Sequence, residues 1–140
     1  MKRYILLLLS IIFAVLLSNA QSYKVIVNKA NPNVTLTTKE VSNFFLKKKT
    51  KWDNGEKVLP IDLNSRSAVR QSFSKEVIGK SVGAVKSYWQ QYVFAGKGNP
   101  PIEKSNDTDV ISYIKTHSGA IGYVSPQADI SDVKELKITK

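Results

Sequence analysis

Two serines and two arginines lie close together within residues 64–70 and give the chain its best candidate site for binding an anion. A helix that begins here presents unpaired backbone N–H groups and the positive end of its dipole. Serine hydroxyls add neutral donors, and arginines add forked, permanently charged donors that suit phosphate or carboxylate groups. We therefore predict that an anion is bound by Ser65, Arg66, Ser67 and Arg70. The alternative is that Ser65 only caps the helix while both arginines point into solvent.

A second pattern, at residues 79–83, fits the G-x-S-x-G arrangement around the nucleophile of a serine hydrolase, Ser81. Asp107 or Asp109 and then His117 follow in the order that these enzymes use. Such a nucleophile must join a strand to a helix, whereas Ser81 lies between two expected helices and more simply caps the second. His117 more simply lies at a helix C-terminus, where partial positive charge is favourable. We therefore expect no catalytic residue and no enzyme activity.

Metal and cofactor chemistry have little support in this sequence. It has one histidine and no cysteine, and its carboxylates are scattered, so no recognised spacing of metal ligands occurs. The missing cysteines also exclude disulfide scaffolds and thiol catalysis. Tyr88, Trp89, Tyr92 and Phe94 could form a stacking platform for bases or sugars, but their helical spacing favours packing. We expect no metal site and no cofactor.

The first twenty residues are typical of a cleaved secretory signal peptide. Lys2 and Arg3 precede an apolar run over residues 5–17, and small residues lead to a cleavage site after Ala20. The alternative, an uncleaved membrane anchor, needs about 20 apolar residues, and this run is shorter. We therefore predict a periplasmic or secreted protein in which residues 21–140 form one domain.

The charge of the chain indicates anionic partners. The whole chain carries a net charge of +10, and removal of Lys2 and Arg3 with the signal peptide leaves +8, since 10 − 2 = 8. An exported protein seldom meets nucleic acid, so anionic solutes, cell-envelope polymers or acidic protein surfaces are the expected partners.

The elements that must position these residues alternate between strand and helix. Strands are expected at residues 23–27, 58–63, 120–124 and, as an edge strand, 133–138. Helices are expected after a cap at Thr37 or Thr38, over about 66–78, around 85–93, and near 107–116. Strands separated by helices predict an α/β fold with a mainly parallel sheet flanked by helices on both faces.

From Val25 to about Ser125 the sequence resembles the substrate-binding proteins of phosphate ABC transporters. The resemblance is an ordered set of short landmarks that are fairly specific only together. They are residues 25–28 with Asn31-Pro32, residues 36–37 and 44–47, Trp52, Gly55, Arg70, Phe73, Tyr88-Trp89, residues 94–98 with Pro100-Pro101, and Gly119-Ala120-Ile121-Gly122-Tyr123-Val124.

This resemblance implies the periplasmic-binding-protein fold and binding of phosphate or a related oxyanion for an ABC transport system. A full family member has two lobes that close on the anion, and this chain has room for little more than one. At the position of the family's Ser-Gly-Thr-type loop, residues 64–70 keep serines and arginines but lack the Gly-Thr pair. The alternative function is a non-ligand-binding interaction module of the cell envelope with the same fold, docking on a transporter, another envelope protein or a second copy as a homodimer.

Overall fold

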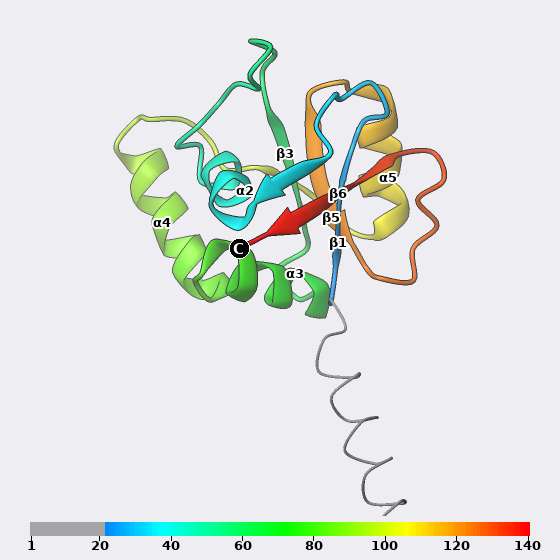
Figure 1. The fold of residues 1–140 in the computed structure, drawn as a ribbon. Helices are drawn as coiled ribbons and strands as arrows, with labels where there is room; N and C mark the ends of the chain where they lie inside the picture. Colours follow the sequence, from blue (N-terminus) through cyan, green and yellow to red (C-terminus); the bar gives the residue numbers. More distant parts are fainter. Residues whose placement is uncertain (1–21) are drawn as a thin grey trace, which may run out of the picture.

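Six strands form one sheet in the order β2-β6-β1-β5-β3-β4 in the computed structural model, which describes residues 22–140 (Figure 1). The strands are β1 (Lys24–Val27), β2 (Thr35–Thr37), β3 (Leu59–Leu63), β4 (Ile102–Lys104), β5 (Ala120–Val124) and β6 (Lys134–Thr139). The predicted signal peptide lies outside the described residues. Within residues 22–140, no helix has the length and apolar character needed to cross a bilayer.

The sheet is mixed but mostly parallel. β1 pairs antiparallel with β5 and β6, whereas β3 pairs parallel with β4 and β5, and β2 pairs parallel with β6. Five of the six strands therefore run in one direction, with β1 opposed to them. The predicted α/β fold with a mainly parallel sheet is confirmed.

One strand lies in a different place from the one predicted. β6 was expected at an edge of the sheet, but it lies between β1 and β2. The actual edges are β2 and β4, strands of only three residues each. Neither edge strand was predicted, because three residues are too few to show an alternating pattern. β2 covers β6 through parallel pairing that is extended by a hydrogen bond from the Lys137 N–H to the Val34 carbonyl, 2.9 Å long.

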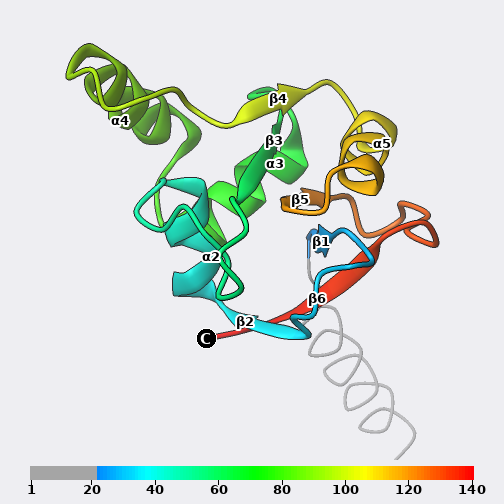
Figure 2. The same ribbon diagram turned by 90° about the horizontal axis from the view of Figure 1, so that it is seen from above.

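The helices are α2 (Thr38–Phe45), α3 (Ala68–Phe73), a π-helical turn η1 (Ser74–Ile78), α4 (Val82–Phe94) and α5 (Asp107–Thr116). α5 covers one face of the sheet, while α2 and α3 cover the other (Figure 2). α4 packs against η1 and lies farther from the sheet than the other helices (Figure 2). Helices therefore flank both faces, as predicted, and α4 projects from the body as an arm.

Side-chain caps fix where the helices begin. At α2, the Thr37 hydroxyl accepts the Glu40 N–H at 3.1 Å and the Glu40 carboxylate accepts the Thr37 N–H at 2.7 Å, a complete capping box. α4 begins after Ser81, whose hydroxyl accepts the Ala84 N–H at 3.1 Å, so the predicted cap role of Ser81 is confirmed.

The cap predicted at Ser65 is wrong. α3 begins two residues later, and its cap is Ser67, whose hydroxyl accepts the Arg70 N–H at 3.3 Å. Asn64 causes the delay. Its side-chain oxygen accepts the Arg66 N–H at 2.9 Å and its carbonyl accepts the Ser67 N–H at 2.9 Å, so the chain makes a turn before the helix begins.

Candidate functional site

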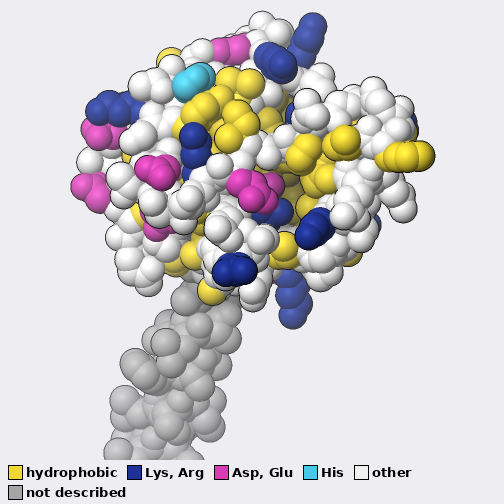
Figure 3. Space-filling view, turned by 180° about the vertical axis from the view of Figure 1, so that it is seen from behind, with side chains coloured by type: hydrophobic (Ala, Val, Ile, Leu, Met, Phe, Trp, Pro, Cys, Tyr) yellow, Lys and Arg dark blue, Asp and Glu magenta, His cyan; other side chains and the backbone are white. Residues whose placement is uncertain are grey.

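A cleft of about 300 Å³ lies between the α4 arm and the β3–β4 side of the sheet. The residues that line it and carry a polar or charged side-chain group are Asp62, Ser65, Arg70, Lys86, Trp89 and Glu103. Figure 3 shows the hollow beside the arm, with acidic, basic and apolar side chains gathered around it. Asp62 and Glu103 are register partners on β3 and β4, Arg70 comes from α3, and Lys86 and Trp89 come from α4. The cleft therefore joins residues from four elements.

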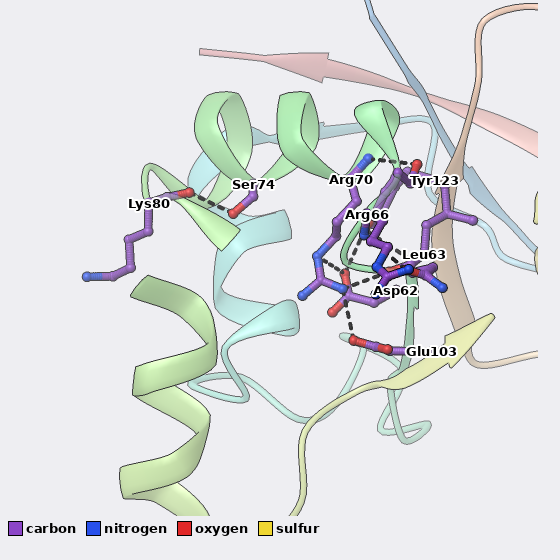
Figure 4. Close-up of polar contacts among 10 residues, drawn as sticks. Asp62, Leu63, Arg66, Arg70, Ser74, Lys80, Glu103 and Tyr123 are labelled. Carbon is purple, nitrogen blue, oxygen red and sulfur yellow. Dashed lines mark hydrogen bonds and ion pairs between the residues drawn. The ribbon is translucent and has the colours of Figure 1, made fainter. Parts of the chain in front are cut away.

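Arg70 is the buried centre of the polar wall of the cleft (Figure 4). Its Nη1 donates to the Leu63 carbonyl at 2.7 Å and to the Glu103 carboxylate at 3.2 Å. Its Nε lies 3.6 Å from Oδ1 of Asp62, and both of these side chains are more than 90% buried. A guanidinium holds several acceptors at once because its donors form a fixed fork. Arg70 thereby ties α3 to β3 and β4.

Asp62 is held from the other side by Tyr123 of β5. The Tyr123 hydroxyl donates to Oδ1 of Asp62 at 2.8 Å and accepts the Leu63 N–H at 3.1 Å. Burial raises the pKa of the Asp62 carboxyl to about 6, although the Arg70 guanidinium and the Tyr123 hydrogen bond act to lower it. Burial also raises the pKa of the Tyr123 hydroxyl, and the nearby Asp62 raises it further, so Tyr123 remains a neutral donor.

The raised pKa of Asp62 predicts a pH dependence of stability. An aspartate in an unfolded chain has a pKa of about 3.9, so the folded state holds this proton more tightly. The contribution of Asp62 to the free energy of unfolding therefore falls as the pH rises from about 4 to about 6, by roughly 2–3 kcal/mol, and is constant outside that window. Urea unfolding of the wild type and Asp62→Asn at several pH values measures this. The substitution should remove that slope, and an unchanged slope in the variant would contradict the assignment.

The structure brings only half of the predicted anion-binding residues to the cleft. Ser65 and Arg70 line it, whereas Arg66 and Ser67 are not among its lining residues. Ser67 is occupied as the cap of α3, and the Arg66 side chain is exposed and forms no ion pair with any residue in 22–140. Arg70 differs most from the prediction, because two carboxylates already surround it.

Sequence reasoning missed three charged residues of the cleft, Asp62, Lys86 and Glu103, and it weighed Trp89 as part of a stacking platform but favoured packing for it. One of them had a recognisable signal. Asp62 is a single carboxylate within the apolar run of residues 58–63, and a buried carboxylate needs a partner. Glu103 and Lys86 had none, because they come from a short strand and from the polar side of a helix.

The residues of the hydrolase pattern do not form a catalytic group in the described part of the chain. His117 stacks on Tyr113 with ring centroids 3.8 Å apart, and its Nδ1 lies 2.8 Å from the Tyr113 carbonyl oxygen. Asp107 accepts hydrogen bonds from the Ser125 amide and hydroxyl. Each of these side chains therefore has local partners that account for its position.

Comparison with known proteins gives a fold relationship. No family model matches the chain, and no curated protein matches it significantly. Solved structures do match. An ABC-type phosphate transport receptor from Vibrio cholerae matches 84% of this chain and 46% of its own with a TM-score of 0.66 at 17% identity.

Two further structures give the same result. A structure assigned to a phosphate ABC transporter substrate-binding protein from Clostridium perfringens, with phosphate bound, matches 84% of this chain and 44% of its own, with a TM-score of 0.64 at 20% identity. PstS from Borrelia burgdorferi matches 85% of this chain and 47% of its own, with a TM-score of 0.64 at 14% identity. The chain therefore spans less than half the length of these proteins, and it has the fold of one lobe of the substrate-binding proteins of phosphate ABC transporters.

Proposed function

We propose that this protein is exported and that its cleft binds phosphate or a related oxyanion weakly, without chemical turnover, for an ABC transport system. One observation carries the proposal: a cleft lined by Ser65, Arg70 and Lys86 lies in a domain with the fold of phosphate-binding proteins, one of which was solved with phosphate bound. Arg66 and Ser67 do not line the cleft, but we include both in the proposed anion site, because Arg66 is exposed beside Ser65 and the Ser67 hydroxyl, which accepts the Arg70 N–H, still has its own proton to donate.

The charges of the cleft restrict which anion it would accept. Arg70 is paired with Asp62 and Glu103, so the cation left to attract a ligand within the cleft is Lys86, with Arg66 at the adjoining turn. The Glu103 side chain is 56% exposed and would repel a fully ionised anion. Hydrogen phosphate retains a P–OH group that can donate to a carboxylate, whereas sulfate has no such proton. We therefore expect phosphate to bind better than sulfate.

Isothermal titration calorimetry at pH 7 tests this proposal directly. Phosphate should bind with a dissociation constant in the millimolar range, and Arg66→Ala should weaken binding roughly tenfold, because a hydrogen bond to a charged group contributes about 1.5–3 kcal/mol. Lys29→Ala is the matched control, since it removes one exposed cation from the loop that follows β1. The absence of heat with millimolar phosphate, or an equal loss in both variants, would overturn the ligand proposal and leave the fold unaffected.

A second candidate function is docking on another envelope protein. The observation that favours it is the exposure of Phe94 at the end of α4, where the side chain is 95% accessible to solvent. Val93 beside it is 46% exposed, and a contiguous exposed apolar patch is typical of an interaction site. This function does not depend on whether the cleft binds an anion.

A further inference from the structure

An open apolar groove of about 480 Å³ runs along the α4 arm. We define the α4 groove by its lining residues, Lys86, Trp89, Gln90, Val93, Phe94 and Pro100. Only Val85 and Trp89 of α4 are buried, so most of this helix does not contribute to the core of the domain. Val93 is 46% exposed and Phe94 is 95% exposed, and Figure 3 shows apolar side chains out to the tip of the arm.

The packing of the domain does not explain this exposure. Full burial of a phenylalanine contributes about 1.5–3 kcal/mol, and Phe94 contributes almost none of that in this structure. The helix ends directly after it at Ala95, and the glycines at 96 and 98 then take positive φ as the chain turns. Val93 and Phe94 are therefore held in water at the end of an ordered helix rather than on a loose terminus.

Trp89 lines the inner side of the groove and is only 6% exposed. Its indole N–H is buried and has no hydrogen-bond partner, the one such side-chain atom found among residues 22–140. The other tryptophan, Trp52, donates its indole N–H to the Gly119 carbonyl at 3.0 Å. Leaving a buried donor unpaired costs about 1–3 kcal/mol. The N–H is enclosed by the domain itself, so Trp89 can offer the groove only the accessible part of its side chain.

The charge around the groove identifies the chemistry of the partner. Between Glu76 and Glu103 the sequence contains no acidic residue, and its charged residues there are Lys80, Lys86 and Lys97. One lysine therefore lies in the groove and the others lie near the two ends of the α4 arm. An apolar groove that contains a lysine, on an arm without acidic residues, complements an acidic surface that carries an apolar anchor.

We propose that the α4 groove docks an acidic segment of another protein, which inserts a large apolar side chain beside Trp89, Val93 and Phe94. This proposal rests on the second candidate function and is independent of oxyanion binding. A second copy of the chain fits less well, because residues 22–140 carry a net charge of +8 (19 Lys and Arg against 11 Asp and Glu) and the copies would repel.

Selection from a random dodecapeptide library displayed on phage tests the proposal. The expected consensus combines Asp or Glu with a large aliphatic or aromatic residue. In NMR titrations, the synthetic consensus peptide should shift the indole N–H resonance of Trp89 and leave that of Trp52 in place. Phe94→Ser and Lys86→Glu should each weaken the peptide's affinity at least tenfold. Val34→Ser is the matched control, since Val34 is 67% exposed but lies before β2, outside the groove, and it should have no effect.

Four results would overturn the proposal. They are no enrichment, a consensus without acidic residues, peptide binding that Phe94→Ser leaves unchanged, and Phe94-dependent binding to phosphatidylglycerol vesicles in place of peptide. Sedimentation velocity of the wild type and Phe94→Ser is a further test. A dimer that Phe94→Ser dissociates would assign the groove to a second copy and would also overturn the proposal. Phosphate calorimetry tests anion binding in the cleft, and peptide selection tests docking in the groove. Each proposal can therefore fail while the other stands.

Discussion

Replacement of Arg70 by methionine is expected to lower the free energy of unfolding by about 3–5 kcal/mol at pH 8, the usual loss when one partner of a buried ion pair is removed. The substitution leaves the Asp62 carboxylate buried without its cation and leaves the Leu63 carbonyl without its 2.7 Å donor. Near pH 5 the loss should be smaller, because the pKa of Asp62 is about 6 and a protonated carboxyl needs no cation. Urea unfolding at both pH values measures the difference.

Two companion variants make this prediction specific. Arg66→Ala removes a neighbouring arginine that is exposed and forms no ion pair within residues 22–140, so its effect should stay within about 0.5 kcal/mol. Arg70→Met combined with Asp62→Asn should recover part of the loss, because the buried charge is removed together with its partner. If Arg70→Met costs no more than Arg66→Ala, Arg70 is not the centre of the polar wall.

The second large effect is expected at Gly119, the residue before β5. A Cβ atom there would lie 2.2 Å from the Lys57 carbonyl oxygen, and backbone cannot move aside as a flexible side chain can. The Gly119 carbonyl also accepts the Trp52 indole N–H and the Leu59 N–H, each at 3.0 Å. Gly119→Ala must therefore separate the start of β3 from the start of β5. We expect a loss of at least about 3 kcal/mol, at the upper end of the usual cost of overpacking.

Gly83→Ala is the control for this substitution. Gly83 lies in the first turn of α4, and the nearest atom to its added Cβ would be the Ser81 hydroxyl oxygen at 3.9 Å. Since alanine is the better helix former, this variant should be neutral or more stable by up to about 1 kcal/mol. Thermal unfolding followed by circular dichroism compares the two. Equal melting temperatures for Gly119→Ala and the wild type would show that the backbone approach at Lys57 is not as close as described.

Most of the fold could be predicted from the sequence where the local pattern and the tertiary structure agree. β5 was recognised as a buried strand, and all five of its residues are buried. The start of α4 was recognised from Ser81, because a serine before an apolar helical repeat has few other roles. The position of β6 inside the sheet could not be predicted, because it depends on pairing with the three-residue strand β2.

The candidate site was less predictable because its geometry depends on distant residues. Arg70 was recognised as a chemically important side chain, but its burial between Asp62 and Glu103 requires β3 and β4 to pair in register. The cap is Ser67 and not Ser65 because of the hydrogen bonds that Asn64 makes. Both serines are good caps by residue type, so the sequence alone does not show which of them begins the helix. Propensity and periodicity describe single elements, whereas the cleft is formed where four elements meet.

The two proposed functions use different parts of one side of the molecule. Trp89 and Lys86 of α4 line both the cleft and the α4 groove, so the arm is shared by the two surfaces. A partner docked in the groove would therefore contact the helix that supplies the free cation of the cleft. Anion binding and docking would be coupled if docking shifts α4, and any such coupling must be equal in both directions.

The claim that the cleft binds an oxyanion is tested most directly by an NMR titration of the ¹⁵N-labelled protein with phosphate at constant ionic strength and pH 7. We predict saturable shifts of the backbone amides of Ser65, Arg66 and Ser67 and of the Trp89 indole N–H, with smaller shifts under sulfate. Shifts that are absent, that sulfate reproduces fully, or that occur only at lysines far from the cleft would contradict the claim.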